Sequence, residues 1–256
     1  YTVAGVTFQP SEFVKILFIF FLAGALWQNV TLPRVILTTI LAGIHVMVLV
    51  VSRDLGSALI FFVGFVFILF VATRNYLYLL AGILGGAGAS FAAYEMFEHV
   101  RTRVLAWRDP WSYIDNQGYQ ITQSLFAMGS GSWFGMGLTM GSPDKIPVVE
   151  QDFIFSAISE EMGCVFSVCL ILVCISTFLM FMNIAMIVKD AYYKLLALGL
   201  GVVYAFQVFL TIGGAVKFIP LTGVTLPLVS YGGSSLLATL IMFALIQGIY
   251  IGREYV

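Results

Sequence analysis

The 256-residue chain is 61% hydrophobic and only 10% charged, with a mean hydropathy of +1.01. This composition excludes an ordinary soluble globular domain, and apolar runs of about 20 residues indicate membrane spans. Because the net charge is −1, the chain offers no strongly basic surface, and we expect no nucleic-acid partner.

Seven apolar stretches can cross a bilayer as helices, which satisfy their own backbone groups in lipid. They cover residues 13–27, 32–51, 55–73, 76–97, 153–182, 192–216 and 234–251. A polar loop, residues 98–151, separates the fourth stretch from the fifth. The sequence therefore predicts an all-α, polytopic transmembrane helical bundle with about seven spans, forming a single membrane domain over residues 1–256.

The Lys and Arg residues of short loops indicate the orientation, because cytoplasmic loops are enriched in them. If the C-terminus is cytoplasmic, the inner cations are Arg34, Arg74, Lys189, Lys194 and Arg253, and the outer ones are Lys15, Arg53 and Lys217. The same orientation gathers these ionisable groups at the outer end of the bundle: Glu12, Lys15, Arg53, Asp54, Asp152 and Lys217. The loop 98–151 is then extracellular.

The first span opens with Gln-Pro-Ser-Glu-Phe-Val-Lys, residues 9–15. Pro10 suits the first turn of a helix, and Glu12 lies where the helix dipole favours negative charge. Glu12 and Lys15 are three residues apart and can pair. Either they form an ordinary helix cap with a lysine that snorkels to water, or they line one wall of an outward-facing charged cavity.

The corner between the second and third spans reads Ser-Arg-Asp-Leu-Gly-Ser, residues 52–57. Asp54 can cap the third span. The planar guanidinium of Arg53 suits a phosphate, although Asp54 or lipid headgroups are alternative partners.

Basic residues and tryptophans interleave over residues 101–111, at the start of the polar loop. This pattern is typical of an amphipathic segment on the membrane surface, and such a segment could guide a lipid-linked polar headgroup. A short helix is expected over residues 119–128, followed by a glycine-rich loop over residues 129–141.

Three carboxylates mark the start of the fifth span. A carboxylate at the bilayer centre costs about 3 kcal/mol and is by default a functional candidate. Asp152 stands where this span meets the loop, as a helix cap or as a functional group. On a continuous helix Glu160 is turned by about 80° from Asp152 and Glu161 by about 180°. We therefore expect Glu160 at a cavity edge and Glu161 on an interhelical hydroxyl. Four small residues share the face of Asp152: Ser156, Ser159, Gly163 and Ser167.

The segment 217–235 carries two prolines and three glycines in an apolar background. Broken backbone at membrane depth is tolerated where it is buried in protein or lines a cavity. Its residues 230–235 precede the last span and can present backbone amides to an anion. The alternative is a re-entrant packing element.

Five blocks, taken together, resemble the shape, elongation, division and sporulation family (FtsW, RodA and SpoVE). They are Gln-Pro-Ser-Glu-Phe-Val-Lys, Asp-Leu-Gly-Ser-Ala-Leu, Gly-Tyr-Gln-Ile-Thr-Gln-Ser-Leu, Asp-Phe-Ile-Phe-Ser-Ala-Ile-Ser-Glu-Glu-Met-Gly and Pro-Leu-Val-Ser-Tyr-Gly-Gly-Ser-Ser. They occur in family order over nearly the whole chain. Since the family has ten spans, the resemblance implies that three N-terminal spans are missing here.

The resemblance implies a peptidoglycan glycosyltransferase that polymerises lipid II with inversion, at the outer face of the bacterial cytoplasmic membrane. A class B penicillin-binding protein, a transpeptidase, is the implied partner. Asp152 matches the essential acidic residue of the family and would be the general base. The candidate substrate-binding residues are Glu12, Lys15, Arg53, Asp54, Glu160, Lys217, Ser230, Gly232, Gly233 and Ser234. A divalent cation, Mg²⁺ or Mn²⁺, is a candidate cofactor with Asp152 as its candidate ligand.

Two other functions fit polar groups in a membrane bundle: a flippase for the lipid-linked precursor, and a non-catalytic scaffold for the transpeptidase. A flippase needs polar groups at the midplane that both faces can reach, whereas the charges here gather at one end. A scaffold predicts that Asp152 and Arg53 tolerate neutral substitution.

Overall fold

The computed structural model describes residues 2–3, 6–7, 9–28 and 30–252, so that Arg253, used above for orientation, lies outside the described residues. Most of the described chain is helical, which confirms the all-α fold predicted from the sequence. A short antiparallel hairpin of β1 (Thr2–Val3) and β2 (Val6–Thr7) precedes the first helix.

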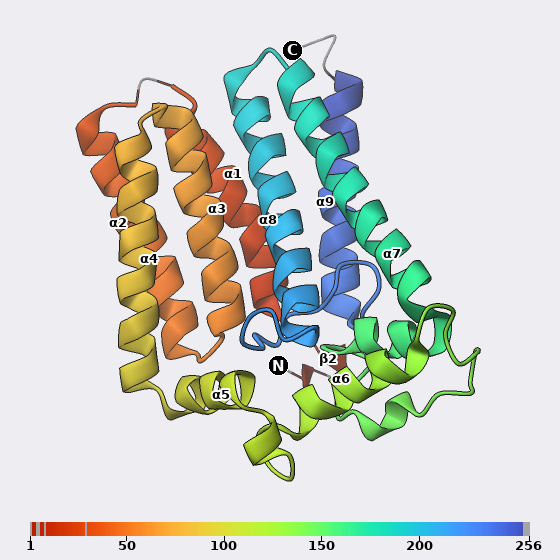
Figure 1. Cartoon of the computed structure of the whole chain (residues 1–256). Helices are drawn as coiled ribbons and strands as arrows, with labels where there is room; N and C mark the ends of the chain where they lie inside the picture. The colour runs from red at the N-terminus through yellow and green to blue at the C-terminus, as the bar shows by residue number, and fades with distance from the viewer. Residues whose placement is uncertain (1, 4–5, 8, 29, 253–256) are drawn as a thin grey trace. The chain divides into compact units, whose positions relative to one another are not determined.

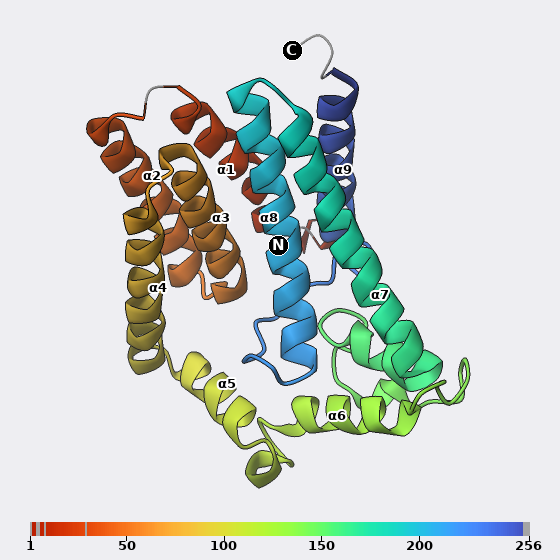
Figure 2. The same ribbon diagram turned by 45° about the horizontal axis from the view of Figure 1, so that its top comes forward.

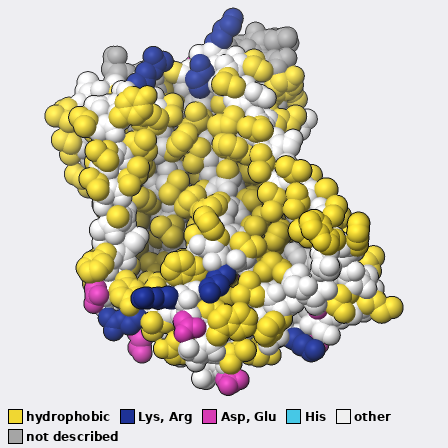
Figure 3. Space-filling model, viewed as in Figure 1, with side chains coloured by type: hydrophobic (Ala, Val, Ile, Leu, Met, Phe, Trp, Pro, Cys, Tyr) yellow, Lys and Arg dark blue, Asp and Glu magenta, His cyan; other side chains and the backbone are white. Residues whose placement is uncertain are grey.

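The long helices match the predicted spans to within a few residues. They are α1 (Pro10–Leu26), α2 (Leu32–Val51), α3 (Leu55–Thr73), α4 (Tyr76–Met96), α7 (Ile154–Ile187), α8 (Ala191–Ala215) and α9 (Gly233–Gly252). Among the described residues, six helices are long and apolar enough to cross a membrane: α2, α3, α4, α7, α8 and α9. Helix α1 has 17 residues, which is about the lower limit for a spanning helix. Hydrophobic side chains cover most of the face shown in Figure 3, as expected of helices that contact lipid.

The polar loop also folds into helices, which Figure 2 shows as short separate elements. They are α5 (Glu98–Arg108), η1 (Trp111–Tyr113), α6 (Tyr119–Gly131) and η2 (Pro143–Lys145). The amphipathic segment is thus a helix over most of its length, and the short helix expected from residue 119 is α6.

The chain forms two compact units, whose helices are labelled in Figure 1. Unit 1 comprises the described residues of Tyr1–Gly86, Ser176–Phe206 and Gly232–Val256, and unit 2 comprises Ala87–Ile175 and Gln207–Tyr231. The chain passes between the units within α4, α7 and α8, and again just before α9.

In unit 1, α1 packs against α2, α3 and α9. Ile19 and Leu22 of α1 are fully buried in this core. Gly64 of α3 allows close packing, since a Cβ there would lie 3.3 Å from Val203 Cγ2 and 3.4 Å from Ile19 Cδ1. Because α2 and α3 form a hairpin, their corner returns to the end of unit 1 at which α1 begins.

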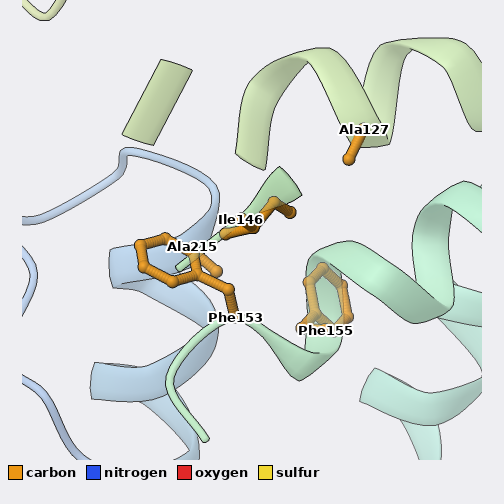
Figure 4. Close-up of a cluster of buried hydrophobic side chains, with 5 residues drawn as sticks. All are labelled: Ala127, Ile146, Phe153, Phe155 and Ala215. Atoms are coloured by element: carbon orange, nitrogen blue, oxygen red, sulfur yellow. The ribbon is translucent and has the colours of Figure 1, made fainter. Parts of the chain in front are cut away.

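In unit 2, a small apolar cluster joins the polar loop to the helices (Figure 4). Its buried members are Ala127, Ile146, Phe153, Phe155 and Ala215. Phe153 is fully buried and directly follows Asp152 in the chain. The cluster therefore anchors the main chain beside the candidate base.

Helix α7 is interrupted at Gly163, where the sequence analysis expected a continuous span. Gly163 has φ +85° and ψ 176°, a backbone conformation that is essentially restricted to glycine. An unbroken helix would pair the amides of Cys164 and Val165 with the carbonyls of Glu160 and Glu161. The break leaves these four backbone groups in need of other partners.

Residues 132–140, which we call the strap, supply those partners. Cys164 N donates to Ser132 O at 2.9 Å and Val165 N to Trp133 O at 3.2 Å; Met136 N donates to Glu160 O at 2.9 Å and Gly137 N to Glu161 O at 3.0 Å. The four strap bonds thus satisfy the groups of the two helical hydrogen bonds that the break removes. Glycine is required both in α7 and in the strap. A Cβ at Gly163 would lie 2.3 Å from Gly135 N, and one at Gly135 would lie 2.1 Å from Glu161 O.

Candidate functional site

Glu12 and Lys15 form a buried ion pair in the first turns of α1. Lys15 Nζ donates to Glu12 Oε2 at 2.5 Å, and the side chains are only 4% and 7% exposed for lysine and glutamate, respectively. This burial differs from the snorkelling alternative, in which the ammonium reaches water. The pair places two opposite charges inside unit 1, near the end at which α1 begins.

Asp54 is the N-cap of α3 and also connects two helices. Its Oδ1 accepts from Ser57 N at 3.1 Å, as the capping prediction requires, and its Oδ2 accepts from Ser11 Oγ at 3.2 Å. Asp54 therefore ties the start of α1 to the start of α3. Arg53 stands beside it with φ +61° and an exposed side chain, at the corner between α2 and α3.

Helix α9 begins in unit 1 and packs against α1. Gly232 O accepts from Leu236 N at 2.8 Å, so Gly232 stands at the N-cap position. A Cβ on Gly233 would meet no atom within 4 Å, so the space beside the first turn is open. The free amides of Gly233 and Ser234 carry the positive end of the helix dipole and suit an anion.

In unit 2, Asp152 faces Arg103 across the exposed backbone of Gly223. A Cβ built on Gly223 would lie 3.7 Å from Asp152 Oδ2 and 3.8 Å from Arg103 Nη2. Gly223 has φ +74°, so glycine permits this turn, and a side chain at this position would contact both groups. The carboxylate and the guanidinium thus both lie beside Gly223.

Helix α5 holds Arg103 against the irregular segment between α8 and α9. Arg103 Nη1 donates to Thr222 O at 3.3 Å, and Trp107 Nε1 donates to Lys217 O at 3.1 Å. The hydroxyl oxygen of Thr222 is buried and has no hydrogen-bond partner among the described residues. A polar atom in this state marks a position for a further partner such as water or substrate.

The environment of Asp152 changes its acidity. Burial raises the pKa of the Asp152 carboxyl above its ordinary value, and the positive charge of Arg103 partly opposes this rise. A carboxylate with a raised pKa is a stronger base than an ordinary exposed aspartate. Such shifts are frequent at functional sites.

Ser230 fixes the segment that carries Asp152. Its hydroxyl donates to Gln151 O at 2.5 Å and accepts from Leu226 N at 2.8 Å. Tyr231 N donates to Glu150 O at 2.8 Å. The sequence predicts that Ser230 binds substrate, and in the structure its hydroxyl is bonded to the main chain next to Asp152. A residue in this position orients the carboxylate.

Glu160 and Glu161 both hold the loop that crosses the break in α7. Glu160 Oε1 accepts from Ser142 N at 3.1 Å, and Glu161 Oε1 accepts from Thr139 N at 3.1 Å. The partner of Glu161 is therefore a loop amide, not the interhelical hydroxyl that we expected. Glu160 is 6% exposed, and its Oε2 has no hydrogen-bond partner among the described residues.

The serines expected on the face of Asp152 are buried and bonded to protein. Ser156 Oγ lies 2.6 Å from Ser124 Oγ of α6, and Ser159 Oγ lies 2.7 Å from Ser167 Oγ. They therefore stabilise packing and do not line a cavity. The physical reason is that Asp152 precedes α7, so the angular relation of a continuous helix does not apply.

Comparison with known proteins gives a family. The family model FTSW_RODA_SPOVE, described as "Cell cycle protein", matches residues 1–254. The chain belongs to this family. It is accordingly a polytopic membrane protein.

Two curated relatives illustrate the similarity. Peptidoglycan glycosyltransferase RodA of Mycobacterium tuberculosis (strain ATCC 25618 / H37Rv) is 39% identical over 266 residues, which cover 98% of this chain and 57% of that protein. Probable peptidoglycan glycosyltransferase FtsW of Aliivibrio salmonicida is 34% identical over 246 residues, covering 90% of this chain and 60% of that protein. The chain thus spans less than two thirds of the length of these relatives.

Solved structures share the fold. The crystal structure of the rod shape determining protein RodA of Thermus thermophilus has a TM-score of 0.70 and 27% identity, covering 99% of this chain and 69% of that chain. A chain of a peptidoglycan synthase complex, described as coordinating polymerization and crosslinking, has a TM-score of 0.81 and 27% identity, covering 99% and 73%. These matches confirm the FtsW/RodA/SpoVE fold expected from the sequence.

The candidate residues of this family member fall into two groups. Unit 1 holds Glu12, Lys15, Arg53, Asp54, Gly232, Gly233 and Ser234, and unit 2 holds Asp152, Glu160, Lys217 and Ser230. Three residues beside Asp152 were not among the predicted site residues: Arg103, Thr222 and Gly223. The sequence shows the interleaved arginines and the segment 217–235 with its prolines and glycines. It does not show that Arg103 bonds to Thr222 of that segment.

Among the described residues, no group of three or more His, Cys, Asp or Glu side chains could hold a metal ion. Mg²⁺ commonly takes one or two protein carboxylates and completes its shell with phosphate oxygens and water. Asp152 fits such a cation only as a single carboxylate ligand.

Proposed function

We propose that the protein is a peptidoglycan glycosyltransferase that polymerises lipid II into glycan strands at the outer face of the bacterial cytoplasmic membrane. Its membership of the FtsW/RodA/SpoVE family and the names of its relatives support the reaction class. The observation that carries the proposal is the approach of the Asp152 carboxylate and the Arg103 guanidinium to the same exposed glycine, Gly223.

In the proposed reaction, Asp152 accepts the proton of an acceptor sugar hydroxyl. The hydroxyl oxygen attacks the anomeric carbon of the donor, a carbon–oxygen bond forms, and the bond to the polyprenyl pyrophosphate breaks. Attack opposite the leaving group inverts the anomeric centre and gives a β-linked strand. General-base catalysis of this kind contributes about 10²–10⁴-fold.

Cations in this protein suit the negative charge that develops on the departing pyrophosphate. Arg103 lies beside the base, and Lys217 lies on the segment to which α5 is bonded. In unit 1 we propose Arg53 and the N-terminus of α9 as separate anion contacts, whereas the charge of the candidate Lys15 is compensated by Glu12. Preorganised charges of this kind are often the largest single contribution to catalysis.

A divalent cation, Mg²⁺ or Mn²⁺, is proposed to come with the donor pyrophosphate and to use Asp152 as its protein carboxylate. When bound, it neutralises charge on the leaving group. A class B penicillin-binding protein is the proposed partner, since one structural relative is part of a complex that couples polymerization to crosslinking.

The test is direct: purified protein receives fluorescent lipid II in detergent, with and without the transpeptidase and Mg²⁺, and the products are separated on a gel. We expect a ladder of glycan strands. If no strands form under any condition while the protein, reconstituted in vesicles, moves the precursor between leaflets, the flippase is the correct function. If it does neither but stimulates the transpeptidase, it is a scaffold.

The acid limb of the pH–rate profile tests the pairing of Asp152 with Arg103. A base with a raised pKa loses activity, as pH falls, at a higher pH than ordinary aspartate. Arg103 opposes that rise, so Arg103→Gln should move the acid limb to higher pH and lower the plateau rate by about 10²-fold. The polymerisation rate measured across pH gives both quantities.

Arg101→Gln is the matched control for this experiment. Arg101 lies on the same helix, is exposed, and contacts Glu95 at 3.4 Å and the Tyr94 ring at 5.5 Å. Its replacement should leave the acid limb in place. If the acid limb of the pH–rate profile is unchanged in Arg103→Gln, or shifts equally in both variants, a specific interaction between Arg103 and Asp152 is ruled out.

A further inference from the structure

The position of the break in α7 sets the depth of this helix in the bilayer. Helix α7 consists of two helical parts that meet at the break at Gly163, and the hydrocarbon core measures about 30 Å. Residues 164–187, about 36 Å long, span the core on their own. The residues before the break carry Glu160 and Glu161, whose charge favours the aqueous side.

Gly163 thus lies close to one boundary of the hydrocarbon core, and the strap lies beside it. The strap is held at this height by four backbone hydrogen bonds that bridge the break. The Glu161 carboxylate accepts a further strap amide, that of Thr139. Since these backbone groups are satisfied within the protein, they carry no penalty of unpaired amides where the strap meets an apolar medium.

The side chains of the strap are large, apolar and exposed. They are Trp133 (67% exposed), Phe134 (85%), Met136 (48%), Leu138 (69%) and Met140 (73%). Five such exposed residues lie within a short bonded segment, and exposed apolar surface of this amount is unfavourable in water. Tryptophan in particular is typical of the belt at which membrane proteins meet the headgroup region.

We propose that the strap is a membrane-interface anchor whose apolar side chains insert into phospholipid, in the leaflet on the side of Asp152. The anchor fixes the break in α7 at the boundary of the hydrocarbon core. Residues 154–162, and Asp152 before them, then lie on the other side of the break from the spanning part of α7. The inference concerns lipid binding and is independent of the proposed glycosyl transfer.

Site-directed spin labelling of the whole chain in phosphatidylcholine–phosphatidylglycerol vesicles tests the anchor. In a background with Cys164, Cys169 and Cys174 replaced by alanine, labels are attached to Phe134→Cys and Leu138→Cys. The lipid control is Leu172→Cys, which is 58% exposed in the spanning part of α7. The water control is Gln117→Cys, an exposed polar position of the same loop.

The readout is the accessibility of each label to oxygen, which concentrates in lipid, and to a water-soluble nickel chelate. We expect labels at Phe134 and Leu138 to match Leu172, with oxygen accessibility several-fold above nickel accessibility. Values that match Gln117 would overturn the proposal. Labels that neither reagent reaches would also overturn it, because a protein surface and not lipid would then cover the strap.

Discussion

Asp152→Asn is expected to lower lipid II polymerisation by about 10²–10⁴-fold while the protein remains folded. Asparagine has nearly the same shape as aspartate, so the contacts of the neighbouring main chain are retained: Phe153 in its buried cluster, and Gln151 with Ser230. What is lost is the group that accepts the proton. The initial rate of strand formation, followed on a gel with fluorescent lipid II, measures the effect.

The thermal stability of Asp152→Asn distinguishes a loss of the proton-accepting group from a loss of folding. Because burial raises the pKa of Asp152 in the folded protein, the folded state binds its proton more tightly than the unfolded state does. This contribution to stability is complete at acidic pH and is lost as pH rises through the folded-state pKa. Above that pKa the ionised carboxylate therefore destabilises the fold relative to its protonated form, and Asp152→Asn should there melt at the same temperature as the parent or higher.

Asp144→Asn is the control, since Asp144 is an exposed carboxylate of the same loop. It should polymerise lipid II at the parental rate. Near-parental activity of Asp152→Asn would remove Asp152 from the proposed chemistry. A melting temperature well below that of the parent at neutral pH would instead show that the carboxylate is a structural requirement.

The second large effect is expected from Gly163→Ala, which should destabilise the protein by about 3 kcal/mol or more. Alanine strongly disfavours φ +85° with ψ 176°. Its methyl group would also lie 2.3 Å from Gly135 N and 2.5 Å from Trp133 O, both of them backbone atoms that cannot rotate away. The strap must then separate from α7, and the four bridging hydrogen bonds are lost. Thermal unfolding in detergent, followed by intrinsic fluorescence, measures the change.

Gly129→Ala provides the matched substitution. Gly129 lies in α6, and a Cβ there would meet no atom within 4 Å. Alanine favours the helix by about 0.5–1 kcal/mol over glycine, so this variant should be as stable as the parent or slightly more stable. Equal melting temperatures for Gly163→Ala and Gly129→Ala would show that α7 can run unbroken without loss of stability.

The sequence by itself determined the membrane class, the spans and the local polar contacts. The limits of α2 and α3 were predicted to the residue, because the length of an apolar run is a local property. The Glu12–Lys15 pair and the Asp54 cap were also predictable, since both involve groups three residues apart on a helix or at its start.

Only the tertiary structure decided what surrounds Asp152 and how α7 is broken. Arg103 and Thr222 are 119 residues apart, and Ser230 and Gln151 are 79 residues apart. No periodicity encodes such contacts. The strap could not be predicted from the sequence for a further reason. Its bridging bonds join backbone amides to backbone carbonyls, and every residue except proline provides both groups. Side-chain patterns report burial and charge, whereas a backbone bond between distant segments exists only once the chain has folded.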